Sequence, residues 1–109
     1  MSEKLYTFYA IAKSSEIPEG ERLFIEISGR SIVVFNIGGQ LHAIEDICTH
    51  DNGPLGDGEV EGFEVICPRH GARFDVRDGR VTRLPAVQPV PHYPVRIVGD
   101  TVEVGIPTA

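Results

Sequence analysis

Two short stretches decide the fold of this chain: CTHDNGP at residues 48–54 and CPRHGARFD at residues 67–75. Each pairs one cysteine with one histidine, as C-x-H in the first stretch and C-x-x-H in the second. They contain both cysteines of the chain and two of its four histidines. Because two thiolates and two imidazoles form a complete set of four protein ligands, the two stretches together predict a metal centre.

The spacing of these side chains bears on which metal they bind. Structural zinc sites usually pair cysteine with cysteine and histidine with histidine, with at least two residues between the members of a pair. Here each stretch mixes the two types, and a single residue separates Cys48 from His50. In a Rieske centre, one iron of a binuclear cluster binds two cysteines and the other binds two histidines. A loop that reaches both irons must supply one of each, so the pattern favours such a cluster, with a zinc-stabilised interaction module as the alternative.

These stretches also resemble a known family. Cys48–His50 and Cys67–Gly71 look like the two cluster-binding boxes of Rieske 2Fe–2S proteins, and the likeness continues through Phe74-Asp75 and residues 89–95. Within that superfamily the chain is similar to the ferredoxin component of multicomponent aromatic-ring dioxygenase systems. The resemblance implies an all-β Rieske fold, an antiparallel β base with an inserted cluster-binding subdomain of short strands and two ligand loops. It also implies one Rieske 2Fe–2S cluster, bound by Cys48, His50, Cys67 and His70.

The rest of the chain reads as short strands separated by turns. Leu23, Ile25 and Ile27 lie on one face and alternate with Phe24 and Glu26 on the other, which is typical of a half-buried strand. Residues 31–37 form a nearly continuous β-branched run and predict a central strand, and Pro94 indicates an edge position. Asp78-Gly79 predicts a hairpin turn. We therefore expect strands at 5–12, 22–27, 31–37, 41–44, 64–66, 74–76, 81–82, 93–98 and 101–104.

With 109 residues, the chain predicts a single domain, 1–109. We divide it into a base, residues 1–45 and 87–109, and a cluster-binding part, residues 46–86. Leu84-Pro85-Ala86 has two interpretations: it covers the cluster, as a proline-containing segment does in the family, or it crosses back to the base. Sequence does not decide between them.

Composition excludes several functions. Sixteen acidic against ten basic side chains give a formal charge of −6, which disfavours nucleic-acid binding. The first residues contain no long apolar run, so we expect a soluble, cytoplasmic monomer without a membrane anchor. An oxygenase would need a mononuclear iron held by two histidines and a carboxylate, and only His42 and His92 remain for it. We expect His42 to be a polar strand residue and His92 to lie at the surface, so no catalytic residue is assigned.

By resemblance, the chain is expected to be a one-electron carrier rather than an enzyme. It would take electrons from an NADH-dependent flavoprotein reductase and pass them to a terminal Rieske non-haem iron oxygenase. A redox small subunit of another enzyme, such as a nitrite reductase, is the alternative within the superfamily. Rieske proteins of quinol-oxidising complexes carry a disulfide and two hydroxyl donors beside the cluster, and the matching positions here predict a low potential because they are Gly53, Arg69, Ala72 and Phe74.

Overall fold

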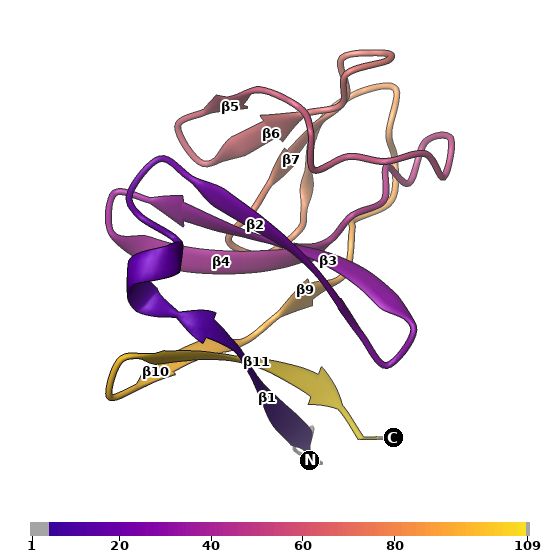
Figure 1. Ribbon diagram of the computed structural model, residues 1–109. Helices are drawn as coiled ribbons and strands as arrows, with labels where there is room; N and C mark the ends of the chain where they lie inside the picture. The colour runs from indigo at the N-terminus through magenta and orange to yellow at the C-terminus, as the bar shows by residue number, and fades with distance from the viewer. Residues whose placement is uncertain (1–4, 109) are drawn as a thin grey trace.

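The computed structural model describes residues 5–108, and these form three antiparallel sheets with one 3₁₀ turn, Ser14–Glu16 (Figure 1). The prediction of an all-β fold is confirmed. No helix among the described residues is long and apolar enough to cross a membrane.

Two of the sheets are built from the two ends of the chain. The first has the order β1-β11-β10, in which β1 (Tyr6–Lys13) pairs with β11 (Thr101–Pro107) and β11 with β10 (Val95–Val98). The second has the order β2-β3-β4-β9, with β2 (Arg22–Ile27), β3 (Arg30–Ile37), β4 (Gln40–Glu45) and β9 (His92–Tyr93). Pro94 lies between β9 and β10, the edge strands of two different sheets, and belongs to neither strand.

The third sheet lies between the two halves in sequence. Its order is β5-β6-β7-β8, with β5 (Val60–Glu61), β6 (Glu64–Ile66), β7 (Arg73–Asp75) and β8 (Val81–Arg83). The predicted hairpin at Asp78-Gly79 is confirmed: Gly79 has a φ of +78°, and its N–H donates to the Asp75 carbonyl at 2.7 Å. Strands β5 and β9 have only two residues each, too few to show an alternation of apolar and polar side chains in the sequence. The single strand expected over 93–98 is divided into β9 and β10.

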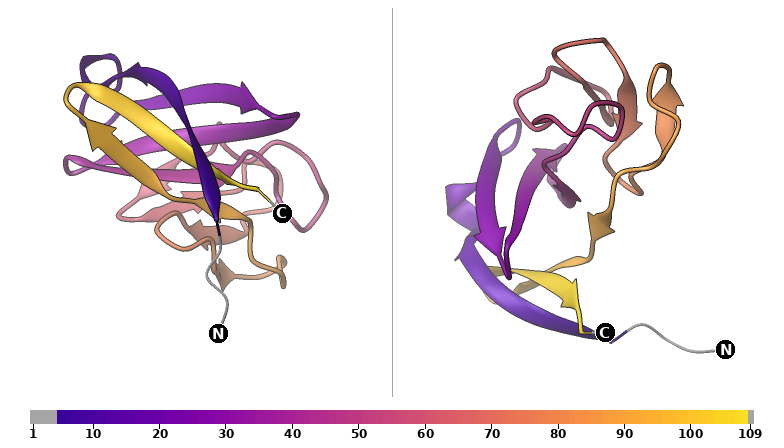
Figure 2. Two further views of the ribbon diagram at one scale, coloured as in Figure 1. Left: turned by 90° about the horizontal axis from the view of Figure 1, so that it is seen from below. Right: turned by 90° about the vertical axis from the view of Figure 1, so that its right-hand side faces the viewer.

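The β2-β3-β4-β9 sheet is the middle layer of the molecule. In the right-hand view of Figure 2, β1 and β11 lie below it and the third sheet lies above it. The alternating residues of β3 are therefore divided between two cores: Ile32 and Val34 pack in one, and Val33 and Phe35 in the other. This explains the β-branched run that predicted a central strand, since β3 is buried on both faces and lies between β2 and β4.

Candidate metal centre

The two cysteines begin two turns with the same hydrogen bonds. In the first ligand loop (residues 48–54), the Cys48 N–H donates to the carbonyl of residue 53 and the Cys48 carbonyl accepts from the N–H of residue 52, both at 2.7 Å. In the second ligand loop (residues 67–72), the Cys67 N–H donates to the carbonyl of residue 72 at 2.7 Å, and its carbonyl accepts from the N–H of residue 71 at 3.0 Å. Each turn thus spans the same number of residues from its cysteine.

A left-handed residue closes each turn at the equivalent position. Asn52 has a φ of +61° and Gly71 a φ of +75°. Asparagine and glycine are the residues that adopt this conformation most readily, so the local sequence fits the turn in both loops. Figure 1 shows that the two loops, magenta and salmon, project at the same end of the molecule.

The four candidate ligands lie in two like pairs. Cys48 and Cys67 are fully buried in the same core, and they lie near enough for each thiol to affect the pKa of the other. His50 and His70 are exposed, and their ring centroids lie 4.9 Å apart with the rings nearly perpendicular. The folded chain therefore brings together sulfur with sulfur and imidazole with imidazole, although each loop supplies one of each.

Burial and nearby backbone N–H groups have opposite effects on the pKa values of the two thiols. Burial and the neighbouring Cys67 raise the pKa of the Cys48 thiol, although the backbone N–H groups of His50 and Asp51 act against this. Burial would also raise the pKa of the Cys67 thiol, but the backbone N–H groups of Arg69 and His70, together with the Arg69 charge, lower it. Backbone donors aimed at sulfur are suited to hold thiolates or bridging sulfides.

This arrangement fits a binuclear cluster better than a single zinc ion. A tetrahedral zinc site needs its ligands gathered around one point. Within residues 5–108, no three or more cysteine, histidine, aspartate or glutamate side chains are placed in that way. The separate thiol and imidazole pairs instead match the division of ligands between the two irons of a Rieske centre.

The segment 84–89 lies against the first ligand loop. The Thr49 hydroxyl donates to the Gln88 carbonyl at 2.6 Å, and Ala86 is buried in the same core as both cysteines. Pro85 follows a cis peptide bond and is exposed, and the side chains of Leu84 and Val87 are also exposed, at 71% and 77%. The segment therefore packs beside the ligand loops through Ala86 while its other apolar side chains face outward.

Two side chains, Arg22 of the base and Asp46 just before the first ligand loop, hold the chain that leaves this loop. The Arg22 guanidinium donates to the carbonyls of Gly56 and Gly58 and lies over the Phe35 ring. The Asp46 carboxylate accepts from the N–H groups of Leu55 and Gly56 at 2.9 and 2.6 Å. Sequence reasoning missed both side chains, because neither has a motif that marks it.

The remaining histidines do not join the ligand pairs. His92 is exposed on β9, as predicted. His42 lies on β4, as expected, but it is half-buried: its ring stands edge-on to Phe63 with centroids 5.9 Å apart, and its Nε2 is buried without a hydrogen-bond partner among the described residues. Burial and the nearby Arg77 lower the pKa of His42, while Asp75 opposes that shift.

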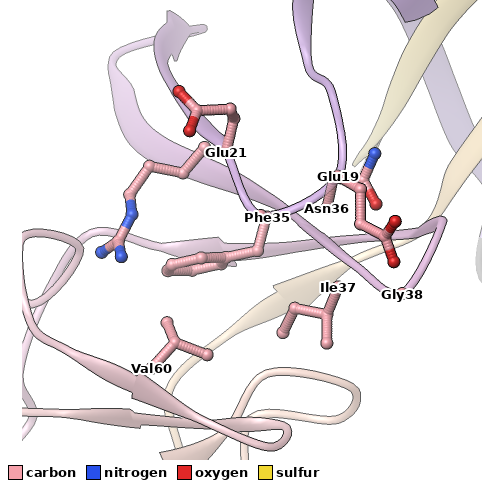
Figure 3. Close-up of a pocket in the computed structure, with 9 residues that line it drawn as sticks. Glu19, Glu21, Phe35, Asn36, Ile37, Gly38 and Val60 are labelled. Carbon is pink, nitrogen blue, oxygen red and sulfur yellow. The ribbon is translucent and has the colours of Figure 1, made fainter.

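A cavity of about 300 Å³ lies away from the ligand loops (Figure 3). Phe35 and Ile37 of β3 line it together with Val60 of β5, and Glu19 and Glu21 stand at its rim. It thus follows the boundary between the base and the third sheet. None of the four candidate ligands lines it, so it has no part in the metal centre.

Comparisons with known proteins agree with this geometry. The model of the Rieske [2Fe-2S] domain family matches residues 7–94. The ferredoxin component of a naphthalene 1,2-dioxygenase system from Pseudomonas aeruginosa is 37% identical over 91 residues, covering 84% of this chain and 88% of that protein.

Solved structures show the same likeness. The ferredoxin of carbazole 1,9a-dioxygenase from Nocardioides aromaticivorans IC177 is 32% identical, with a TM-score of 0.84 over 90% of this chain and 96% of that one. A ferredoxin chain in a complex of reduced oxygenase and oxidized ferredoxin of carbazole 1,9a-dioxygenase is 28% identical, with a TM-score of 0.83 over 89% of this chain and 91% of that one.

Proposed function

Because the chain belongs to the Rieske [2Fe-2S] domain family, we propose that it is the ferredoxin of an aromatic-ring dioxygenase system. In this role it accepts single electrons from an NADH-dependent flavoprotein reductase in the cytoplasm and passes them to a terminal Rieske non-haem iron oxygenase. Two relatives named as ferredoxins of dioxygenase systems support the proposal, since each is covered over most of its length.

One observation carries the proposal: the thiol pair is buried while the imidazole pair is exposed. Cys48 and Cys67 would hold one iron and His50 and His70 the other, and the bound cluster supplies one-electron redox chemistry. The buried thiols keep solvent from the sulfur side. The exposed imidazoles give a partner's redox centre its nearest approach, so electrons enter and leave at the tips of the ligand loops.

The surroundings of the imidazoles suit a protein partner. Leu84 and Val87 expose apolar surface on the segment that packs against the first ligand loop. A small apolar rim beside an exposed redox centre fits a transient complex, because such interfaces are small and must release quickly. The net charge of −6 favours a basic docking face on the partner. A complex between a similar ferredoxin and its oxygenase supports this choice of partner.

Analysis of the purified protein tests the ligand assignment. We expect two irons and two acid-labile sulfides per chain, with two inequivalent iron sites by Mössbauer spectroscopy. His50→Ala and His70→Ala should lose the cluster, whereas His92→Ala, which removes an exposed histidine outside the loops, should keep it. Stoichiometric zinc in protein produced with adequate iron, or equivalent iron sites, would contradict the assignment.

Electron transfer tests the role itself. The cluster-loaded protein would be reduced anaerobically by the reductase component of a naphthalene or carbazole dioxygenase system in the presence of NADH, then mixed with the matching oxygenase in a stopped-flow instrument. We expect reduction and reoxidation on the timescale of turnover. Substitution of Val87 by Glu should slow reoxidation without changing cluster content, because it places a charge on the exposed apolar rim. Failure with every ring-hydroxylating oxygenase tried would place the chain in a different electron-transfer system.

A further inference from the structure

An ion pair joins the two ligand loops. Asp51 in the first loop and Arg69 in the second form a fork, with Arg69 Nε 2.6 Å from Asp51 Oδ2 and Arg69 Nη2 2.8 Å from Asp51 Oδ1. Arg69 Nη1 also donates to the Pro54 carbonyl at 2.7 Å. Asp51 directly follows His50, and Arg69 directly precedes His70. The ion pair therefore joins the two loops next to the imidazoles.

The packing around this pair is specific. The Arg69 guanidinium lies on Gly53, where an added Cβ atom would be only 2.7 Å from Arg69 Cζ. The Gly53 N–H donates to Asp51 Oδ1 at 3.0 Å, which orients the carboxylate from its own loop. Glycine at this position therefore leaves room for the arginine and helps to hold its partner.

Both charges lie close to the candidate ligands. Arg69 Nη2 is 3.5 Å from the Cys67 sulfur, and Asp51 Oδ2 is 3.6 Å from His70 Nδ1. The two parallel hydrogen bonds of the fork are the geometry of a guanidinium with an ionised carboxylate. The Arg69 side chain is about a third exposed and the Asp51 side chain about a quarter. An ion pair with this much solvent exposure contributes little to the free energy of unfolding. Its geometry points to a local role.

We propose that Asp51 and Arg69 are positioning residues that strap the two ligand loops together and set the reduction potential of the cluster through their opposed charges. This inference rests on the ligand set proposed above. A Rieske core is about neutral when oxidised and carries one negative charge after reduction. The arginine charge therefore favours the reduced state, the aspartate charge favours the oxidised state, and each offsets the other while they remain paired.

Variants that remove one charge at a time separate the effect of the Arg69 charge on the reduction potential from that of the Asp51 charge. Asp51→Asn leaves the Arg69 charge uncompensated beside the Cys67 sulfur and should raise the midpoint potential. Arg69→Gln leaves the Asp51 charge uncompensated and should lower it. The double variant should fall between the two single variants. A merely structural role would not move the potentials in opposite directions, because both single variants break the same fork.

The measurement is protein-film voltammetry on the cluster-loaded proteins, with iron content and the rate of cluster loss to a chelator measured in parallel. Both single variants should lose the cluster faster than the parent. Arg96→Gln and Glu103→Gln are matched controls, because they break an ion pair of 2.7 Å on the base and change the net charge by the same amounts. These controls should leave potential and cluster loss unchanged.

The conservative variant Arg69→Lys covers the case in which Asp51→Asn or Arg69→Gln retains no cluster. It keeps the charge but cannot form the fork, so the potential should stay near the parent value while cluster loss becomes faster. Shifts in the same direction for both single variants, or unchanged potentials, would overturn the tuning role. Unchanged cluster loss in all Arg69 variants would overturn the strap. A parent protein without iron would instead contradict the ligand set, so the two failures are distinguishable.

Discussion

The base and the cluster-binding part of this molecule are built in different ways. In the base, β1 and β3 have eight residues each and β11 has seven, whereas no strand of the third sheet is longer than three. The core of the base is mainly aliphatic, and its one buried phenol, Tyr93, donates to Glu45 and accepts from Arg30. The other core contains both cysteines among its buried side chains.

This difference indicates what stabilises each part. Burying one valine or isoleucine contributes about 1.5–3 kcal/mol, so long strands with two apolar faces can support the base. Strands of two or three residues form few interstrand hydrogen bonds and need further contacts. In the cluster-binding part these include the Arg22 and Asp46 contacts to the exit of the first loop. A bound cluster adds to them, because the unfolded chain has no preformed site and binding therefore contributes to folding.

The largest effect is expected from removing a thiolate. Cys67→Ala should abolish cluster assembly, because one iron loses half of its proposed protein ligands. Amide hydrogen exchange should then show loss of protection in β5–β8 while β1 and β11 keep theirs. Val76→Ala is the matched control, since it removes a buried side chain from the same core and should retain the cluster. Equal loss of protection in β1 and β11 would mean that the base does not fold independently of the cluster.

A substitution in the core of the base should lower the free energy of unfolding but leave the midpoint potential of the cluster unchanged. Ile32 is almost completely buried among the side chains between the first two sheets. Ile32→Ala should lower the free energy of unfolding by about 2–5 kcal/mol through lost burial and the cavity left behind. The midpoint potential should stay at the parent value, because the cavity lies on the face of β3 directed away from the ligand core. Denaturant unfolding and voltammetry on the same sample measure both quantities, and a shifted potential would show that the two parts are mechanically coupled.

The two parts also differ in how far the sequence predicts them. Period-two patterns such as Leu23, Ile25 and Ile27 predicted half-buried positions that the structure confirms. The presence of one cysteine and one histidine in each stretch predicted a binuclear centre, because a loop that reaches both irons of a Rieske cluster must supply one ligand of each type. The ligand roles of these four side chains stay a prediction, and the structure shows only that the side chains meet in like pairs.

What sequence could not show depends on tertiary placement. Asp51 and Arg69 are 18 residues apart, and only the shape of both turns brings them together. His42 alternates with Leu41 and Ala43, which indicates a polar strand residue but not that its ring meets Phe63 in the turn between β5 and β6. Residues 84–89 show no alternation of apolar and polar side chains from which their position could be predicted. In the structure, the Thr49–Gln88 hydrogen bond and the burial of Ala86 fix that position.

A smaller effect is expected from adding donors inside the cluster-binding part. Ala72 and Phe74 are fully buried in the core that contains both cysteines, and they occupy the positions where high-potential relatives carry hydroxyl groups. Ala72→Ser or Phe74→Tyr places an O–H near sulfur, and the resulting bond is stronger in the more negative reduced state. A difference of about 1 kcal/mol between redox states corresponds to a rise of roughly 40 mV. Voltammetry on both variants measures this, and unmoved potentials in cluster-loaded protein would remove one support for a low potential.

The smallest effect concerns the boundary between the two parts, where His42 of β4 meets Phe63. The Arg77 guanidinium lies over the same Phe63 ring, 4.1 Å from its centroid, and is paired with Asp75. Because burial and Arg77 lower the pKa of His42, the unfolded chain binds a proton at this residue at a higher pH than the folded protein does. The contribution of neutral His42 is therefore complete above the usual histidine pKa of about 6.5 and is lost as the pH falls toward its lower folded value.

His42→Leu removes this proton-linked term while keeping an apolar side chain against Phe63. The free energy of unfolding of the variant should therefore fall less than that of the parent between pH 7 and pH 5. Every other titratable group is common to both proteins, so the difference between the two profiles isolates His42. Urea unfolding of cluster-loaded protein at several pH values measures it, with His92→Leu on β9 as the control for loss of an exposed imidazole. Parallel profiles for the parent and His42→Leu would show that protonation of His42 does not weaken the contact between the base and the cluster-binding part.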